Sequence, residues 1–365
     1  MKQTTKAENY DNFICIADRC SFSCCKGWDI EVDPKTFPIW EKDTELAGFL
    51  CIDHGKTVIS LTGDKACPFL NERDLCLNIL SGREERLTKI CRTFPRLINR
   101  YEDREEYSLS CACPEVVDML YRRGRAAFLC EGESYAGRAA PRVLLRDSLL
   151  VIIRDNTFPL HERLLLSFHM LVSAKISPKL SAKIAEVYQE EDYRKTLAEE
   201  MRKLCVSPLD TLQETNELML DISQNYHREK HYTPYLKEPY ERAKELETGE
   251  KFDLDRWRDF LKDFQTYEEL FTNCIVTKCF SEGTKGSIDD RIMSFQRIIT
   301  EYILVRYSVY LKSLQDKIDY PAVRDYIVVY TRIIGYNPSG MKEFWQDSFD
   351  TEVWELGYLL LLLGS

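Results

Sequence analysis

The protein has 365 residues, of which 44% are hydrophobic and 30% are charged, and its net charge is −10. This length indicates two domains, and the composition is typical of a soluble globular protein. The negative charge argues against nucleic-acid partners, because non-specific nucleic-acid binding needs a basic face. The first residues lack the apolar run of a secretory signal, and the run Leu359–Leu363 is too short to span a bilayer. We therefore expect a cytoplasmic protein with no membrane span.

Residues 1–123 are predicted to form a small, cysteine-rich α+β domain whose short elements are separated by turns. The expected strands are Asp29–Asp33, Thr57–Thr62 and the two arms of a hairpin, Arg96–Tyr101 and Glu106–Ser110. Glu115–Arg123 has the pattern of a helix. Residues 124–142 are rich in glycine and alanine, and we interpret them as a linker.

Residues 143–365 are predicted to form an all-α domain, so the fold class is mainly α. Three pairs read as an N-cap followed by proline: Ser177-Pro178, Ser207-Pro208 and Thr233-Pro234. The segments with helical spacing of apolar residues are Leu144–Ile153, His161–Ala174, Leu254–Phe271, Arg324–Ile334 and Glu343–Leu363. Ile298–Leu314 is apolar nearly all round, which predicts a buried central helix.

Eleven of the 14 cysteines lie at or before Cys130. In a reducing cytosol they are not expected to form a disulfide framework, and thiolates are soft ligands for zinc, copper(I) or iron–sulfur centres. The candidate metal ligands fall in four groups: Cys15, Cys20, Cys24 and Cys25; Cys67 and Cys76; Cys91; and Cys111 and Cys113. If Ser108–Cys113 is extended, Cys111 and Cys113 point to the same face. The remaining cysteines are interpreted as packing residues: Cys51, Cys130, Cys205, Cys274 and Cys279.

The spacing of these cysteines favours a centre buried between several loops. Structural zinc sites use two paired knuckles; Cys20 and Cys24 could form one, but no second pair with that spacing follows them, so we expect an iron–sulfur cluster and keep zinc as the alternative. The three-cysteine signature of radical S-adenosylmethionine enzymes is not met, because its third position falls on Gly27. A lone histidine, His54, is a further possible ligand but is more simply explained as a solvated loop residue.

Four segments carry a resemblance to a known family: Phe13–Trp28, Cys67–Cys76, Cys91–Arg96 and Ser110–Glu115. Together they resemble the flagellin lysine N-methylase family, which is related to zinc- or iron-chelating cysteine-cluster proteins. Leu144–Leu166 is similar to a helix pair of that family. One position departs from the family pattern, because Arg306 stands where an asparagine is expected before Tyr307. We expect Arg306 to snorkel or to pair with an acid.

The resemblance implies a cytoplasmic enzyme that methylates the ε-amine of lysines on flagellin. S-adenosylmethionine is the implied methyl donor, and a four-iron four-sulfur cluster is the implied cofactor. The family's cysteines fall on Cys15, Cys20, Cys24, Cys25, Cys67, Cys76, Cys91 and Cys113, and Cys111 is an addition.

Methyl transfer needs a neutral amine, so the enzyme must desolvate the lysine or supply a base. Trp28 is a candidate for the wall of a pocket that receives a cation, and thus for cofactor binding. The candidate bases near the cysteines are Asp29, Glu31, Asp33, Tyr107 and Glu115. No glycine-rich turn for the donor follows a predicted strand, and the catalytic residues stay unassigned. The alternative function is a non-catalytic zinc- or iron-binding module for interaction or metal handling.

Overall fold

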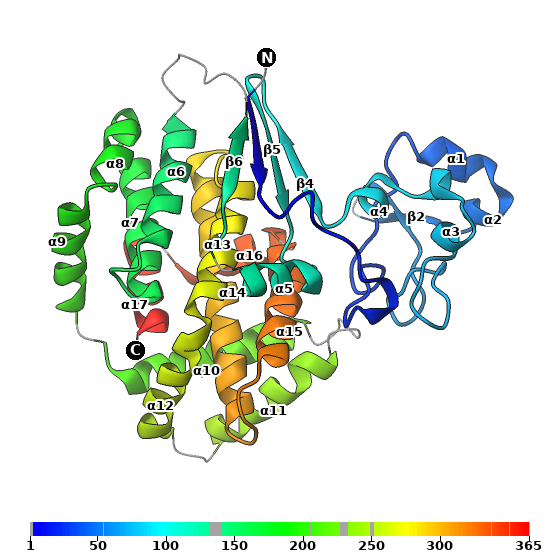
Figure 1. Cartoon of the computed structure of the whole chain (residues 1–365). Coiled ribbons are helices and arrows are strands. Elements are labelled where there is room, and N and C mark those ends of the chain that lie inside the picture. The colour runs from blue at the N-terminus through cyan, green and yellow to red at the C-terminus, as the bar shows by residue number, and fades with distance from the viewer. Residues whose placement is uncertain are drawn as a thin grey trace.

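A computed structural model describes residues 3–53, 55–123, 125–131, 141–204, 206–226, 233–248, 252–336, 338–349 and 351–364. It is mainly helical, as the sequence predicts, and has two small sheets. Figure 1 shows a small lobe standing to one side of a larger helical body. Over the described ranges, no helix combines the length and the apolar character that crossing a bilayer requires.

The strands are β1 (Gln3–Ala7), β2 (Leu50–Asp53), β3 (Lys56–Ile59), β4 (Arg96–Arg100), β5 (Arg104–Leu109) and β6 (Phe128–Glu131). The helices that precede β6 in the chain are α1 (Phe37–Lys42), α2 (Thr44–Ala47), α3 (Leu77–Leu80), α4 (Lys89–Thr93) and α5 (Pro114–Arg123). The later helices are α6 (Pro141–Arg154), α7 (Leu160–Ile176), α8 (Ser181–Val187), α9 (Glu191–Arg202), α10 (Pro208–Tyr226), α11 (Thr233–Thr248), α12 (Leu254–Phe264), α13 (Glu268–Glu282), α14 (Ile288–Ser313), α15 (Tyr320–Tyr330), α16 (Pro338–Ser348) and α17 (Glu352–Leu363).

A four-stranded sheet with the order β4-β5-β1-β6 covers one side of the helical body. β1 is parallel to β5 and antiparallel to β6, whereas β4 and β5 form the predicted hairpin. On β6, Phe128 stacks on Phe280 of α13 with ring centroids 3.9 Å apart. On β5, the buried carboxylate of Glu106 accepts a hydrogen bond of 2.7 Å from Arg146 of α6. The sheet is therefore packed into the helical body.

The small lobe has a core of its own. We call residues 24–94 the cysteine lobe; it contains the β2–β3 hairpin and the short helices α1–α4. Its core consists of Ile30, Val32, Trp40, Leu46, Ile59, Cys67 and Phe69. The two ends of the predicted N-terminal domain, by contrast, join the helical body, because β1, β5 and α5 pack there.

Helix α14 is the centre of the body. Ser287 caps it through a reciprocal pair of hydrogen bonds with Asp290, which satisfies the backbone amides of these two residues. Its side chains are buried over most of its length, and it packs against α7, α10, α13 and α15. The prediction of a buried central helix at 298–314 is confirmed.

Arg306 on this helix behaves differently from the expectation. The side chain is buried, and its Nη2 donates a hydrogen bond of 2.7 Å to the carbonyl of Leu362 in α17. Its guanidinium lies 5.3 Å from the ring centroid of Trp257. It therefore satisfies a carbonyl of the last helical turn, where the backbone has no intrahelical donor, and it does not snorkel to the surface.

Several other expectations need correction. Phe128–Glu131, in the stretch interpreted as a linker, forms β6, and residues 132–140 of that stretch lie outside the described residues. Asp29–Asp33 is not a strand, since Glu31 makes an isolated bridge to Val58. The segments 254–271 and 343–363 each contain two helices, and Ser177-Pro178 begins a 3₁₀ turn. These differences arise because a strand that pairs with a distant segment, or a short break between two helices, produces no periodic pattern of apolar residues in the local sequence.

A buried ion pair generates the first prediction. Lys278 of α13 binds the carboxylate of Glu301 of α14 and donates a hydrogen bond of 2.8 Å to the hydroxyl of Thr331. We expect Glu301→Ala to lower the free energy of unfolding by about 3 to 5 kcal/mol, because it leaves a buried ammonium uncompensated. The double variant Lys278→Met/Glu301→Leu should recover most of this loss.

Urea unfolding followed by circular dichroism measures both effects. The matched control is Asp255→Ala, which breaks the exposed pair between Asp255 and Arg258 and should leave the unfolding midpoint unchanged. A loss in Glu301→Ala no larger than in the control would contradict the burial argument.

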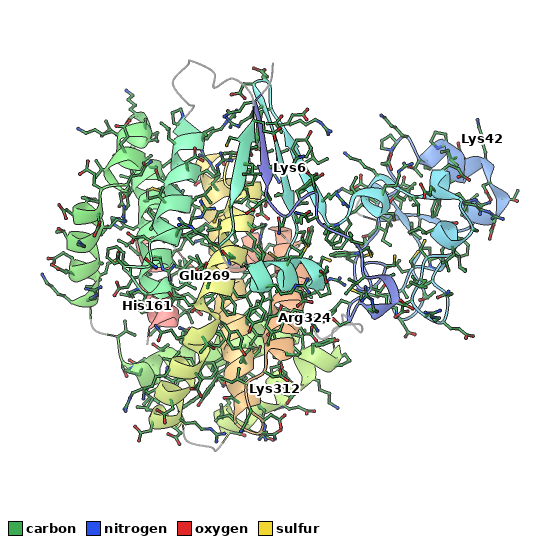
Figure 2. The ribbon with its side chains drawn as sticks, in the orientation of Figure 1. Lys6, Lys42, His161, Glu269, Lys312 and Arg324 are labelled. Atoms are coloured by element: carbon green, nitrogen blue, oxygen red, sulfur yellow. The ribbon has the colours of Figure 1, made fainter. Side chains whose placement is uncertain are left out.

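His161 in the first turn of α7 generates a pH prediction (Figure 2). Burial, together with nearby arginines, lowers the pKa of His161 to about 4 from its usual value of 6.5. The unfolded chain therefore binds a proton at pH 5 that the folded protein does not, so stability falls as the pH drops from 6.5 towards 4. We expect His161→Gln to lose less stability than the wild type between pH 7 and pH 5, measured by urea unfolding. Equal losses in the two proteins would refute this role of His161.

Candidate functional site

A cavity of about 430 Å³ opens where the cysteine lobe meets the helical body. The cysteines that line it are Cys15, Cys20, Cys24, Cys25, Cys67, Cys76, Cys91 and Cys113. These are the eight positions that the resemblance assigns, and they come from four separate parts of the chain. Aromatic side chains complete the wall, among them Phe22, Trp28 and Phe94. The structure therefore brings eight of the nine predicted cysteines to one place.

Backbone contacts hold these cysteines in position. The amide of Cys67 donates to the carbonyl of Cys25 at 2.8 Å, which joins the first and second cysteine groups. Cys91 lies on α4, and the hydroxyl of Thr88, which caps this helix, donates to the Cys91 Sγ at 3.2 Å. Cys76 immediately precedes α3, and Cys113 immediately precedes α5. Helix starts and a cross-loop hydrogen bond thus set the positions of the thiols.

Cys111 is not brought to the cavity. It is buried beside Cys274 of α13, and a hydrogen bond from the Cys274 thiol, assisted by the charge of Lys278, lowers the pKa of Cys111. The expectation that it shares a face with Cys113 assumed an extended chain. Strand β5 instead ends at Leu109, and the chain turns before α5, so the two thiols diverge.

Burial raises the pKa of several cavity thiols, which favours their protonated form. Burial raises the pKa of Cys67 and of Cys113 to about 12, and it also raises the pKa of Cys20 and of Cys91. Cys24 is the exception, because a hydrogen bond from the Cys25 thiol, with the charge of Arg332, lowers its pKa to about 7. A metal bound here would displace protons from the thiols whose pKa is raised.

The residue types suit a soft metal, because eight cysteines line one cavity and thiolates select zinc or iron–sulfur centres. In the described part of the chain, however, no three His, Cys, Asp or Glu side chains are already arranged to hold a metal ion. The thiols therefore share a cavity without forming a ready-made ion site. His54 lies outside the described residues.

Trp28 lines the cavity, as expected of a pocket wall, but its indole N–H and its ring already have partners within the chain. Its indole Nε1 donates a hydrogen bond of 2.8 Å to the carbonyl of Cys24. The guanidinium of Arg332 lies 4.6 Å from its ring centroid. Phe94 and Tyr336 meet the ring edge-on, with centroids 5.2 and 5.4 Å away. The cation that Trp28 contacts in this structure is thus an arginine of the chain itself.

The cavity's described lining residues include none of the five candidate bases, which are Asp29, Glu31, Asp33, Tyr107 and Glu115. The carboxylates that do line it are Asp18, paired with Arg73, and Asp74, paired with Lys26 at 2.5 Å. Asp33 instead caps backbone amides, including that of Lys89 at 2.7 Å.

Arg332, which contacts the Trp28 ring and whose charge helps to lower the pKa of Cys24, is a residue of this site that was not predicted from the sequence. Arg332 stands in an otherwise apolar run, which indicates that it is buried. Because a buried arginine needs partners, this position in the sequence was the signal that could have identified it.

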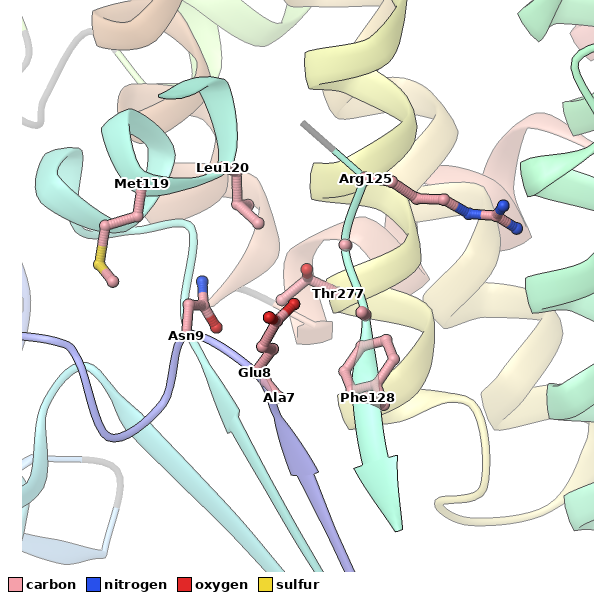
Figure 3. Close-up of a pocket in the computed structure, with 10 residues that line it drawn as sticks. Ala7, Glu8, Asn9, Met119, Leu120, Arg125, Phe128 and Thr277 are labelled. Atoms are coloured by element: carbon pink, nitrogen blue, oxygen red, sulfur yellow. The ribbon is translucent and has the colours of Figure 1, made fainter. Parts of the chain in front are cut away.

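Two other hollows in the described structure are less suited to chemistry. One, of about 20 Å³, lies at the end of β1 among Met119, Leu120 and Thr277, and has room for about one water molecule (Figure 3). The other, of about 750 Å³, lies between α10, α11 and α17 and has no cysteine among its described lining residues.

Comparisons with known proteins give matches to lysine N-methylases and to a flagellar protein. A family model described as the FliB lysine N-methylase C-terminal domain matches residues 146–362, which is more than half of the chain. The chain is 30% identical over 148 residues to a lysine-N-methylase of Salmonella choleraesuis, and 30% identical over 148 residues to one of Salmonella typhimurium. It is 29% identical over 151 residues to the flagellar biosynthetic protein FliU of Salmonella muenchen.

These alignments are partial. Each match to a lysine-N-methylase covers 36% of this chain and 36% of the relative, so the chain spans about a third of those relatives' length. The match to FliU covers 37% of this chain and 88% of that protein. No solved structure matches.

Measuring metal uptake tests whether the cysteines of the cavity bind iron or zinc. We expect Cys67→Ser to lose most of the iron or zinc that the wild type takes up, because it removes a buried thiolate from the donor set. Cys51→Ser is the matched control, since Cys51 is exposed on β2 away from the cavity, and Cys111→Ser should also keep its metal. Elemental analysis and acid-labile sulfide give the readout. Full metal content in Cys67→Ser would remove Cys67 from the ligand set.

Proposed function

This chain belongs to the FliB lysine N-methylase family, and we propose that it is a protein-lysine N-methyltransferase whose reaction takes place at the cysteine cavity. One observation carries the proposal: the eight cysteines of the resemblance surround a single cavity that Trp28 also lines. A volume of about 430 Å³ lies within the range of small-molecule sites, roughly 300 to 1,000 Å³.

The cavity suits the chemistry of methyl transfer to an amine. A free lysine has a pKa near 10.4 and is charged in water, so it cannot act as a nucleophile until it loses a proton. The aromatic wall, with Phe22 and Phe94, disfavours the charged amine, because desolvation lowers the pKa of an ammonium. Asp18 and Asp74 are the carboxylates at the wall, and each would have to release its paired cation, Arg73 or Lys26, to receive that proton.

The proposed donor is S-adenosylmethionine. In the transfer the amine nitrogen forms a bond to the methyl carbon, while the bond between that carbon and the donor's sulfonium sulfur breaks. The sulfur leaves as a neutral thioether, and the proton of the new ammonium passes to a carboxylate or to water. The reaction therefore balances with no redox partner.

The proposed cofactor is a four-iron four-sulfur cluster held by cysteines of the cavity, with zinc as the alternative. The all-sulfur donor set supports it. Such a group, when bound, supplies a soft Lewis acid and joins the loops that carry its ligands. Cys25 and Cys67 are already tied by a backbone hydrogen bond, and Cys91 is fixed by the start of α4.

Flagellin is the proposed substrate, and the cytoplasm is the proposed compartment. One relative is named as a flagellar biosynthetic protein, which supports a flagellar substrate. The net charge of −10 suits a partner that presents lysines. The described cysteines are free thiols, which a reducing compartment preserves.

Co-expression with flagellin tests the activity. We expect the wild type to add methyl groups to flagellin lysines, seen by mass spectrometry of tryptic peptides. Cys67→Ser should lose this activity, because its thiol lies in the cavity wall, while Cys51→Ser should retain it. Unchanged lysine masses beside a metal-loaded wild type would overturn the methyltransferase and favour a non-catalytic metal-binding module.

A further inference from the structure

A π-helical turn, Thr331–Gly335, follows α15 and lies between the core of the body and the cysteine cavity. Turns of this kind are rare and frequently occur at functional sites. Its two neighbouring residues Thr331 and Arg332 bind different partners. Thr331 binds the buried ion pair of the core, whereas Arg332 reaches the segments that carry the cavity cysteines.

The core side holds the turn in place. The Thr331 hydroxyl lies 3.1 Å from Glu301 Oε2 and accepts a hydrogen bond of 2.8 Å from Lys278 Nζ. At the end of the turn, a Cβ added to Gly335 would lie 2.9 Å from Glu301 Oε1, so a side chain there would displace the carboxylate. The buried pair therefore fixes the position from which Arg332 extends.

Arg332 is buried and donates to three backbone carbonyls. Its Nε donates to Ala112 at 3.0 Å, its Nη1 donates to Ser23 at 2.9 Å, and its Nη2 donates to Phe22 at 3.5 Å. Ser23 directly precedes Cys24, and Ala112 directly precedes Cys113. One guanidinium thus joins the chain segments of two cavity cysteines that are far apart in sequence.

The aromatic rings around the guanidinium hold its plane. Its Cζ lies 4.6 Å from the ring centroid of Trp28 and 5.4 Å from that of Phe22. A planar fork donates from three separate nitrogens in a fixed plane, whereas the three donors of a lysine ammonium all sit on one nitrogen and do not reproduce this spacing. The geometry requires arginine in particular.

We propose that Arg332 is the positioning residue of the cysteine centre: by binding the carbonyls of Ser23 and Ala112 it keeps Cys24 and Cys113 at the cavity that is proposed to bind a metal. The inference rests on the proposed function in one respect, namely that the cavity holds a metal. It adds a residue from the C-terminal half, within the range that the family model matches, to a site whose donors lie in the N-terminal part.

The test compares Arg332→Met and Arg332→Lys with a matched control, Arg324→Gln. Arg324 is on α15, and Figure 2 shows it on the side of the body that faces the lobe. It also reaches the first cysteine segment, but through the side chain of Ser21 at 3.4 Å. Far-UV circular dichroism and thermal unfolding establish that each variant is folded.

The first readout needs no metal. Hydrogen–deuterium exchange of the metal-free proteins should show faster exchange for the amides around Ser23 and Ala112 in both Arg332 variants. The change should be smaller in Arg324→Gln, because Arg324 contacts these segments through the side chains of Ser21 and Asp118 and not through their backbone. The second readout is metal retention, measured by chelator competition after loading with iron and sulfide or with zinc. We expect roughly 10- to 100-fold weaker retention in both Arg332 variants, the effect typical of residues that orient metal ligands.

The outcomes separate the two proposals. Wild-type retention in the Arg332 variants, even with faster exchange, overturns the positioning role. Full recovery in Arg332→Lys overturns the carbonyl fork in favour of charge alone. A wild type that takes up neither iron nor zinc overturns the proposed centre and any ligand-positioning role; the exchange data then show only whether Arg332 holds the two segments.

Discussion

The buried pair of Lys278 and Glu301 is the constraint on which the rest of the site depends. A lysine and a glutamate withdrawn from water are stable only when their remaining hydrogen-bonding groups find partners. Thr331 supplies one of these partners, which ties the π-helical turn to α13 and α14. Because Arg332 is the next residue in the chain, the electrostatics of the core decide where its guanidinium meets the cysteine segments.

The cavity belongs to two parts of the molecule at once. The cysteine lobe contributes Cys24, Cys25, Cys67, Cys76 and Cys91, whereas Cys113 comes from the start of α5 in the body. The lobe has a small core, and small cores rarely stabilise a fold unaided. Contacts with the body and any bound metal therefore both add to the stability of the lobe.

The gathering of the cysteines was largely predictable from the sequence, but the contacts around them were not. The grouping of cysteines indicated thiolate chemistry, and eight of the nine predicted ligands meet in one cavity. Cys111 was misplaced because the argument from alternating faces holds only within a strand, and β5 ends at Leu109. The candidate bases were chosen by nearness in sequence, and Asp33 shows the weakness of that criterion, since it caps backbone amides.

The sequence by itself determined the long helices, the hairpin, the family and which cysteines belong together. These properties are encoded in short windows, because helical periodicity and cysteine spacing need only neighbouring residues. Only the tertiary structure decided that β6 pairs with β1 and that Arg332 reaches Ser23 and Ala112. Those contacts join segments up to 309 residues apart, and their geometry depends on how the helices pack and on where buried charges find their partners.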